Sequence, residues 1–276
     1  MKDTPIAFIG GGNMARSLIG GLLASSGTPE CIQVAEPDAS QSELLHSRFG
    51  IHTSTNNREI AAHAKVIVLA IKPQILRSVV EDLAEIVQQN QPLVISIAAG
   101  VREPDICRWL GGQVAVVRTM PNTPALVGSG VTALFANTHV SKVHQALAES
   151  LLRAVGAIVW VRDEALLDAV TAVSGSGPAY FFLIMEALEQ AGIKLGLDKD
   201  TARLLTQQTA FGAAKMALES MESPASLRVR VTSPGGTTER ALETLQNGGL
   251  DALITKAVEH ARQRSHELGD LLGESP

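Results

Sequence analysis

Residues 6–15 read IAFIGGGNMA, so that four apolar residues run directly into three glycines. The residues after this stretch carry apolar side chains at helical spacing, namely Leu18, Ile19, Leu22 and Leu23. A short apolar strand, a tight glycine turn and an amphipathic helix, in this order, open the βαβ unit of dinucleotide-binding folds. The stretch therefore predicts a Rossmann-type fold and a cofactor that carries phosphates.

The spacing of the glycines assigns a separate role to each. Gly10 permits the sharp turn, and Gly12 has no Cβ, so the backbone can come close to a pyrophosphate. Ala15 stands where a third glycine is common, and its methyl group still permits close packing. The N–H groups at the start of the helix then face the phosphates. The glycines alone would also fit an ordinary turn before a helix, whereas the flanking strand and helix favour the dinucleotide site.

A second apolar strand, Ile32–Ala35, ends in Glu36, which lies 24 residues beyond Gly12. Dinucleotide-binding folds place a carboxylate near this spacing, where it binds the ribose hydroxyls of the adenosine. Glu36 is therefore predicted to bind the cofactor.

The composition fits a globular protein with a sizeable core. The chain has 276 residues, of which 45% are hydrophobic and 3% aromatic, and its formal net charge is −5. It has no basic run that would indicate nucleic-acid binding, and unbroken apolar runs such as Val66–Ile71 and Ala179–Met185 are too short to span a bilayer. The N-terminal residues show no secretory signal. We therefore expect a cytoplasmic protein with neither a nucleic-acid nor a membrane partner.

The cysteines and histidines lack the spacing of metal ligands. Cys31 and Cys107 lie far apart and are expected to be isolated thiols in a reducing compartment. The seven histidines are expected at the surface. No metal site is predicted.

Short apolar strands alternate with helical patterns through residues 1–162. Further strands are expected at Val66–Ala70, Leu93–Ile97, Val114–Arg118, Val131–Phe135 and Ile158–Val161. Between them, the helix Ile75–Val87 is expected to bury Ile75, Val79, Leu83, Ile86 and Val87. Such alternation predicts an α/β domain with a doubly wound parallel sheet, whose ligands lie at the carboxyl ends of the strands.

Residues 163–276 show helical patterns and no further strand. The expected helices are Glu164–Val173, Ala179–Ala191, Thr201–Met221, Glu239–Leu245 and Leu250–Leu268. The second of these is apolar on all sides at its start and the third is rich in alanine, so both must be buried. We therefore expect an all-helical second domain that buries these helices against another subunit.

Three strand ends carry residues that suit a ligand. Lys72 and Pro73 follow one strand, small residues at Ala98–Gly100 follow the next, and Asn122 lies between two prolines after the third. Each segment also fits ordinary loop chemistry.

Two turns in the second half stand out. Residues 233–238 read SPGGTT, and successive N–H groups of a glycine turn at a helix N-terminus can hold an anion. The hydroxyls of Ser233, Thr237 and Thr238 add donors, although a hydroxyl-capped helix is the alternative. The segment Ser174–Tyr180, SGSGPAY, is expected to break two helices, either as ordinary turn chemistry or as a substrate wall.

With these motifs on one chain, the sequence resembles the pyrroline-5-carboxylate reductase family, the last enzymes of proline synthesis. The resemblance runs from end to end and rests on Gly10–Met14, Ala70–Pro73, Ala98–Gly100, Met120–Pro124, Ser174–Tyr180 and Ser233–Thr238. The last two motifs are specific to that family.

The resemblance implies reduction of 1-pyrroline-5-carboxylate, a cyclic imino acid, to L-proline by hydride transfer from NADPH or NADH. The cofactor-binding residues it implies are Ile9, Gly10, Gly12, Asn13, Met14, Glu36, Asn57, Ala70, Lys72, Pro73, Ala98, Ala99, Gly100, Met120 and Asn122. The substrate-binding residues it implies are Ser176, Gly177, Val231, Ser233, Gly235, Gly236, Thr237 and Thr238. The hydroxyl of Thr238 is expected to hydrogen-bond the substrate nitrogen. The resemblance also implies a homodimer with interlocked helical domains, and it leaves open a larger oligomer of dimers.

Two departures from the family pattern qualify the resemblance. Ser223–Ala225 and Arg228-Val229 stand where the family often has His-Pro-Gly and Lys-Asp, so this loop is expected to differ in shape. Glu36 replaces small hydroxyl residues that bind a 2′-phosphate in some members, which leaves the choice between NADPH and NADH open.

Two other functions share parts of the pattern. A β-hydroxyacid dehydrogenase would need a lysine a few residues after Gly175, where residues 178–182 read PAYFF. A non-catalytic dinucleotide sensor would keep the first glycine turn but would not need the second.

Overall fold

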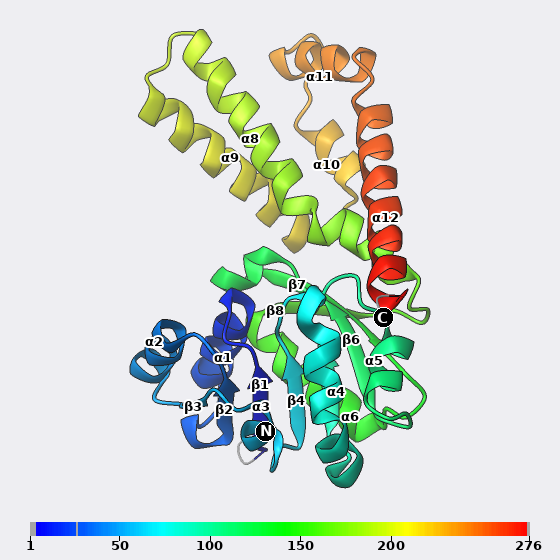
Figure 1. Ribbon diagram of the computed structural model, residues 1–276. Helices are drawn as coiled ribbons and strands as arrows, with labels where there is room; N and C mark the ends of the chain where they lie inside the picture. Colours follow the sequence, from blue (N-terminus) through cyan, green and yellow to red (C-terminus); the bar gives the residue numbers. More distant parts are fainter. Residues whose placement is uncertain (1–3, 26, 275–276) are drawn as a thin grey trace. The chain divides into compact units, whose positions relative to one another are not determined.

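Eight strands form a single sheet in the computed structural model, which describes residues 4–25 and 27–274 (Figure 1). The strands are β1 (Ile6–Ile9), β2 (Ile32–Ala35), β3 (His52–Ser54), β4 (Val66–Leu69), β5 (Leu93–Ser96), β6 (Val116–Met120), β7 (Gly130–Ala136) and β8 (Gly156–Trp160). Their order across the sheet is β3-β2-β1-β4-β5-β6-β7-β8. The first six strands have the order of the doubly wound dinucleotide-binding fold, and the predicted Rossmann-type domain is confirmed.

Two strands differ from the expected pattern. β3 was not among the expected strands, but its three residues pair with β2 at the edge of the sheet. β7 runs antiparallel to β6, whereas all other neighbouring strands are parallel. Only residues 121–129 connect β6 to β7. A parallel neighbour would require a longer crossover, so the chain returns in the opposite direction.

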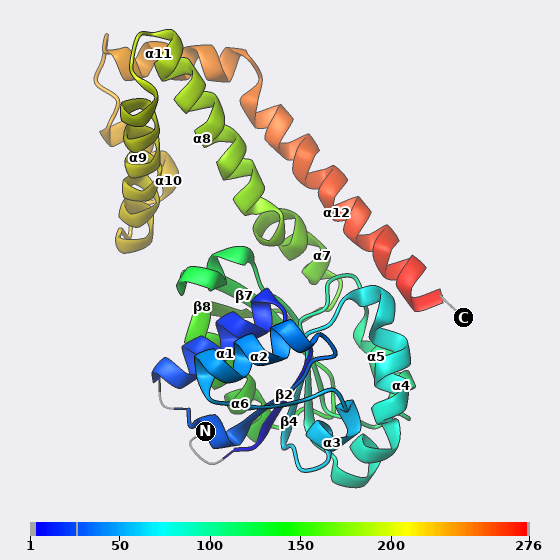
Figure 2. The ribbon, with the colours of Figure 1, turned by 60° about the vertical axis from the view of Figure 1, so that its left-hand side comes forward.

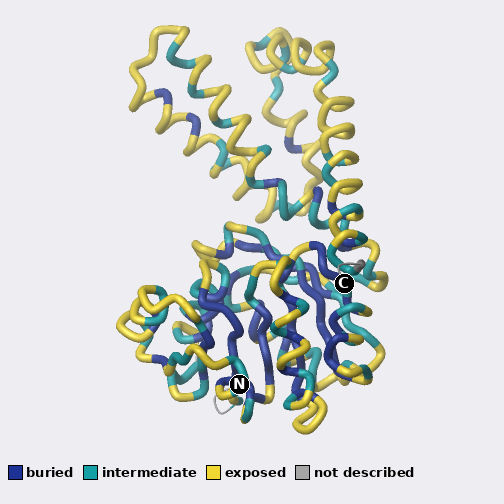
Figure 3. Tube along the Cα trace, viewed as in Figure 1, coloured by how far each residue is buried: buried dark blue, intermediate teal, exposed yellow. Residues whose placement is uncertain are grey.

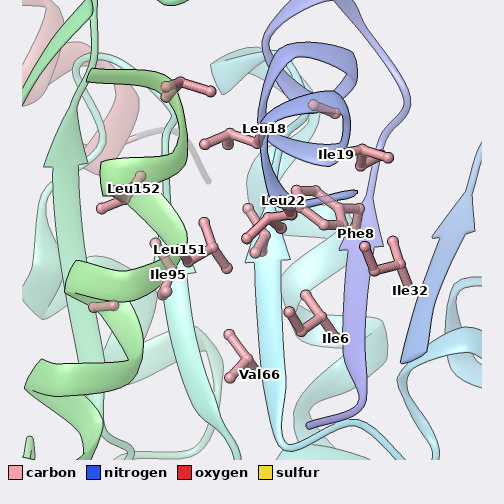
Figure 4. Close-up of a cluster of buried hydrophobic side chains, with 14 of the residues drawn as sticks. Ile6, Phe8, Leu18, Ile19, Leu22, Ile32, Val66, Ile95, Leu151 and Leu152 are labelled. Carbon is pink, nitrogen blue, oxygen red and sulfur yellow. The ribbon is translucent and has the colours of Figure 1, made fainter. Parts of the chain in front are cut away.

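Helices cover both faces of the sheet (Figure 2). One face carries α1 (Asn13–Ser25), α2 (Ala39–Phe49) and α6 (Lys142–Leu152), and the other carries α3 (Asn57–Ala61), α4 (Pro73–Asn90) and α5 (Glu103–Trp109). β1 shows why two cores form. Successive side chains of a strand point to opposite faces, so Ile6 and Phe8 enter the α1 core (Figure 4) while Ala7 and Ile9 enter the α4 core.

The buried face of α4 agrees with the predicted one at Leu83 and Val87 and differs from it in the first turns of the helix. The residues that α4 buries are Leu76, Val80, Leu83 and Val87. Ile75 is half exposed, so the prediction that it belongs to the core face is wrong, whereas Val79 and Ile86 are partly buried and pack against this core. Both stripes are apolar, and the sequence pattern alone does not choose between them.

The remaining helices are α7 (Leu166–Val170), α8 (Gly177–Lys194), α9 (Lys199–Glu219), α10 (Pro224–Arg230), α11 (Thr237–Asn247) and α12 (Leu250–Glu274). The predicted break at Ser174–Tyr180 is wrong, because a π-helix, η4 (Thr171–Gly175), follows α7 and Ser176 keeps a right-handed helical backbone. α10 was not predicted; its signals are the side-chain cap of Ser223 and Pro224 in the first turn.

The contacts divide the chain into two compact units. The sheet unit contains the residues up to Ser176 and those from His260 onward, and the helical unit is Gly177–Glu259. This division falls later than the predicted boundary between residues 162 and 163, because α7 contacts β6 and β7. Most strands of the sheet unit are buried, although β3 and β8 contain only intermediate and exposed residues, whereas α8 and α9 are largely exposed (Figure 3). The functional boundary at residue 163 stays a prediction.

Leu166–Lys194 is long and apolar enough to cross a membrane, on length and composition alone. Its most apolar window has a mean hydropathy of 1.2, and 17% of that window is buried. The sequence analysis considered only unbroken apolar runs. In the structure, the π-helix joins α7 and α8 into this longer stretch.

A network of buried and partly buried polar side chains connects β6, α5 and the residues that follow β7 and β8. Arg118 donates to Glu164 at 2.8 Å, and the same carboxylate accepts the N–H of Glu103 at 2.6 Å. The Glu103 carboxylate itself accepts from Asn137 at 2.6 Å. Burial raises the pKa of Glu103, the Asn137 hydrogen bond opposes this rise, and the charge of Glu164 adds to it.

We predict that Glu103→Gln raises the melting temperature at neutral pH. Glutamine keeps an oxygen for Asn137 and removes the buried charge. Because the folded-state pKa is raised, the ionised carboxylate costs stability above that pKa, and the cost disappears as the pH falls below the ordinary value of 4.5. Thermal melts of both proteins from acidic to neutral pH should therefore show a difference that grows with pH. A difference that is the same at every pH would contradict the prediction.

Candidate active site

The glycine turn after β1 leaves no room for a side chain at Gly10. The φ angle of Gly10 is +99°, and an added Cβ would lie 2.5 Å from the carbonyl oxygen of Ala70. The N–H of Gly10 donates to the carbonyl of Ala35 at 2.8 Å. The turn is thus held between the ends of β2 and β4. By contrast, no atom lies within 4 Å of the position of an added Cβ at Gly12. This open space beside the start of α1 suits a pyrophosphate.

A groove of about 490 Å³ opens at this turn. The predicted cofactor residues among those that line it are Ile9, Gly10, Gly12, Glu36, Asn57, Ala70 and Lys72. The sequence interpretation missed the other lining residues, which are Gly11, Ala35, Pro37, Ile71, Ile75 and Val79. The signal for two of them was present, because Ile75 and Val79 are apolar residues one turn apart on α4, and neither is among the residues that α4 buries fully. An apolar wall opposite a carboxylate suits an adenosine, which presents a flat ring and a polar ribose.

Glu36 is held in place at the glycine turn. Its Oε2 accepts the N–H of Gly11 at 2.8 Å, and its Oε1 accepts the N–H of Asp38 at 3.0 Å. Its own N–H donates to the carbonyl of Ser54 at 2.9 Å. A carboxylate has about four acceptor sites, so Glu36 keeps capacity for ribose hydroxyls.

A second carboxylate, that of Asp38, lies two residues beyond Glu36 in the sequence. Asp38 caps α2 by accepting from the N–H groups of Ser40 and Gln41. Hydrogen bonds from the Ser40 side chain and these N–H groups lower the pKa of Asp38 below its ordinary value of 3.8. A carboxylate at Glu36 would favour a ribose with free hydroxyls over a 2′-phosphate, and this preference stays a prediction.

The other predicted cofactor residues do not line this groove but follow the same edge of the sheet. The strand register pairs Ile9 with Leu69 and Leu69 with Ser96, so the carboxyl ends of these strands lie in a row. The residues concerned begin α1 or α4, follow β5, or lie at the end of β6: Asn13, Met14, Pro73, Ala98, Ala99, Gly100, Met120 and Asn122. Ala98 and Gly100 are buried, whereas Ala99 is exposed.

The side chain of Asn122 has protein partners. Its Oδ1 accepts the N–H of Val131 at 2.9 Å, and its Nδ2 donates to the carbonyl and the hydroxyl of Ser174, each at 3.3 Å. The sequence predicted a direct contact of Asn122 with the cofactor, which stays a prediction.

The Ser233–Thr238 turn lies in the helical unit and precedes α11. Gly236 is the N-cap residue and no side chain caps the helix, so the alternative of a hydroxyl-capped helix is wrong. The N–H of Gly235 donates to Oε2 of Glu239 at 2.7 Å. The turn therefore accommodates a carboxylate. Thr237 and Thr238 are exposed, and no described residue accepts a hydrogen bond from their N–H groups.

The remaining predicted substrate residues flank these turns. Ser176 follows η4, Gly177 begins α8, and Val231 ends α10 as an exposed residue. Ser176 belongs to the sheet unit and the other two to the helical unit.

Comparison with known protein families covers both halves of the chain. A family described as pyrroline-5-carboxylate reductase dimerisation matches residues 164–268. A family described as NADP oxidoreductase coenzyme F420-dependent matches residues 5–100.

Similar proteins match over the full length. The pyrroline-5-carboxylate reductase of Pseudomonas aeruginosa is 50% identical over 99% of this chain and 100% of its own. That of Vibrio alginolyticus is 42% identical over 98% and 100%. The solved structure of a pyrroline-5-carboxylate reductase from Coxiella burnetii superposes with a TM-score of 0.93 at 48% identity, over 96% of this chain and 98% of the other. Plasmodium falciparum pyrroline carboxylate reductase with NADP bound gives a TM-score of 0.85 at 29% identity, over 98% and 99%.

We predict that Glu36→Ser shifts the ratio of dissociation constants toward NADPH by roughly tenfold or more, since ~1.4 kcal/mol corresponds to tenfold. The substitution removes a negative charge from the expected position of the 2′-phosphate. Quenching of NADH and NADPH fluorescence by the protein would measure both constants. Glu43→Ser, which removes an exposed charge from α2, is the control. A wild type that already strongly prefers NADPH would show that Glu36 does not lie at the ribose.

Proposed function

The chain belongs to the pyrroline-5-carboxylate reductase family, and we propose that it reduces 1-pyrroline-5-carboxylate to L-proline with a hydride from NADPH or NADH. The observation that carries this proposal is the full length of the similarity, which spans the glycine turn of the sheet unit and the Ser233–Thr238 turn of the helical unit. A β-hydroxyacid dehydrogenase and a dinucleotide sensor gain no support, because the relatives of full length are reductases.

The glycine turn and the groove beside it would hold the cofactor. The N–H groups at the start of α1 face the open space at Gly12, and Glu36 offers acceptors to the ribose. When bound, the dihydronicotinamide supplies a hydride to the imine carbon, and the electron pair of the C=N bond passes to the protonated nitrogen. A cyclic imine is basic enough to take its proton from water. The protein must therefore orient the substrate and does not need to supply a strong acid.

The Ser233–Thr238 turn would hold the substrate carboxylate. Two observations support this role: the N–H groups of Thr237 and Thr238 have no acceptor among the described residues, and Gly235 already donates to the Glu239 carboxylate. A substrate carboxylate would take the place of Glu239 or bind beside it. The hydroxyl of Thr238 would then hydrogen-bond the ring nitrogen.

We propose a cytoplasmic homodimer, with a larger oligomer of dimers as an open alternative. The dimerisation family covers residues 164–268, and the exposed apolar side chains of α8 and α9 lie in that range. They include Phe181, Phe182, Leu183, Leu204 and Phe211. A second copy that covers them would account for the apolar surface of Leu166–Lys194 without a membrane.

The proposed function predicts that the wild type distinguishes 1-pyrroline-5-carboxylate from bare 1-pyrroline by well over roughly tenfold in kcat/KM. Charge-assisted hydrogen bonds to the carboxylate contribute ~1.5–3 kcal/mol each, and the start of α11 adds ~0.3–1 kcal/mol. Initial rates with each imine, against NADPH and NADH, measure this. Absence of turnover with either imine would contradict the proposed reaction.

The same assay tests the turn itself. Gly236→Val should abolish the discrimination, because an added Cβ would lie 3.0 Å from the carbonyl oxygen of Ser233 and would crowd the carboxylate. Gly212→Ala in α9 is the control, since no atom lies within 4 Å of its added Cβ. Equal turnover of both imines by the wild type would show that the turn only begins a helix.

We further predict that Thr238→Ala lowers kcat/KM for the imine by roughly tenfold or more, because a hydrogen bond to a charged group is worth ~1.5–3 kcal/mol. Cofactor affinity should hardly change. Thr244→Ala removes a threonine hydroxyl from the same helix and serves as the control. Unchanged kinetics in Thr238→Ala would exclude this side chain from the site.

A further inference from the structure

The amide of Asn122 joins two segments that lie far apart in the sequence. Asn122 follows β6, and its Nδ2 donates to both oxygens of Ser174 in η4 at 3.3 Å. Its Oδ1 accepts the N–H of Val131 at the start of β7, at 2.9 Å. Because a backbone N–H can only donate and a carbonyl can only accept, this position needs one acceptor and one donor on the same side chain.

A second contact lies beside this amide. An added Cβ at Gly175 would lie 2.5 Å from Cε of Met120. The end of β6 therefore packs directly against η4, and the glycine leaves space for the Met120 side chain. Both contacts lie within the sheet unit.

The segment that Asn122 contacts has an unusual backbone. The N–H of Ser176 donates to the carbonyl of Thr171 at 2.8 Å, which is the wider hydrogen-bonding step of a π-helix. Such turns are rare in proteins, and those that occur often lie at functional sites. The π-helical turn of η4 contains one residue more than an α-helical turn. If it relaxed to an α-helix, Ser176 would rotate by about 100° around the helix axis, the angle per residue of an α-helix.

We propose that Asn122 is a positioning residue, whose side chain holds η4 in the π-helical form and thereby orients Ser174 and Ser176 for the substrate. The inference rests on the proposed function, because it takes the residues around Ser176 as part of the imine site. It assigns Asn122 to substrate binding through η4, in place of a direct contact with the cofactor.

Asn122→Asp is the sharpest test, because aspartate has the same size and still accepts from Val131 but cannot donate to Ser174 when ionised. We expect KM for 1-pyrroline-5-carboxylate to rise about tenfold and KM for NADPH or NADH to change by less than about twofold. Ser174→Ala should give a smaller rise, since the backbone carbonyl remains as an acceptor. Ser174→Thr should restore the wild-type value, because it keeps the hydroxyl.

Asn137→Asp is the matched control. Asn137 also joins backbone groups, with its Oδ1 accepting from Val116 and its Nδ2 donating to Val114. Its Nδ2 donates in addition to the Glu103 carboxylate, which an aspartate would repel, but Asn137 contacts none of the segments assigned to the site. Asn137→Asp should lower the melting temperature and leave both KM values unchanged. Equal rises of both KM values in Asn122→Asp would show that Asn122 contacts the cofactor, and unchanged values in a folded variant would show that it positions nothing. Either result overturns the proposal.

A readout without turnover separates this inference from the proposed reaction. Amide hydrogen exchange at Ser176 should be faster in Asn122→Asp than in the wild type and Asn137→Asp, because the π-helical hydrogen bond opens more often. Faster exchange in Asn122→Asp, with no imine reduction by any of the proteins, would contradict the proposed reaction but would support the contact between Asn122 and η4. Unchanged exchange would overturn the role of Asn122 even in an active enzyme.

Discussion

The edge of the sheet that would bind the cofactor depends on the close approach of Gly10 to the ends of the two neighbouring strands. The carbonyl of Ala70 occupies the place that a side chain would need, and the N–H of Gly10 is bonded to Ala35. With φ at +99° and no Cβ, the turn can end β1 between β2 and β4 and begin α1 at once. The open space at Gly12 and the groove beside Glu36 both follow from this geometry. A side chain at position 10 would separate the strands and remove the cofactor site together with the sheet edge.

The Ser233–Thr238 turn, which we propose to hold the substrate carboxylate, is built in a similar way. Both turns offer backbone N–H groups to an anion and both hold a carboxylate of their own, Glu36 at Gly11 and Glu239 at Gly235. An internal carboxylate satisfies a donor that would otherwise face water alone, and it keeps the turn in a conformation that suits a ligand oxygen. We infer that such turns bind anions through arrangement of the backbone, with little contribution from charged side chains.

The sequence predicted those parts of the fold in which one local pattern determines one structure. An apolar strand followed by a glycine turn has few alternatives, so β1, the turn and α1 were predictable. Where two structures share a pattern, the prediction was wrong. α4 has two apolar stripes one residue apart, and the sheet selects one of them. The π-helix η4 is in contact with Asn122, which lies far away in the sequence and is invisible to a local pattern, so the local motif was interpreted as a break. Similarly, β3 forms because β2 offers an edge, and its own residues show little strand pattern.

The chemistry explains why the residues alone left the function open. A reductase of a protonated imine has no need for a paired acid and base, so its site lacks the clusters of titratable groups that mark many active sites. Such a site must bind a dinucleotide and one carboxylate, and it must place a hydrogen-bond donor at the ring nitrogen. Glycines, hydroxyls and an amide meet these needs, and each of them is also common in ordinary turns and helix caps. Only their combination on one chain, within a fold that presents backbone N–H groups, distinguishes the site from loop chemistry. The amide of Asn122 illustrates this, since its role depends on the donor and acceptor that it brings to two distant segments and not on any charge.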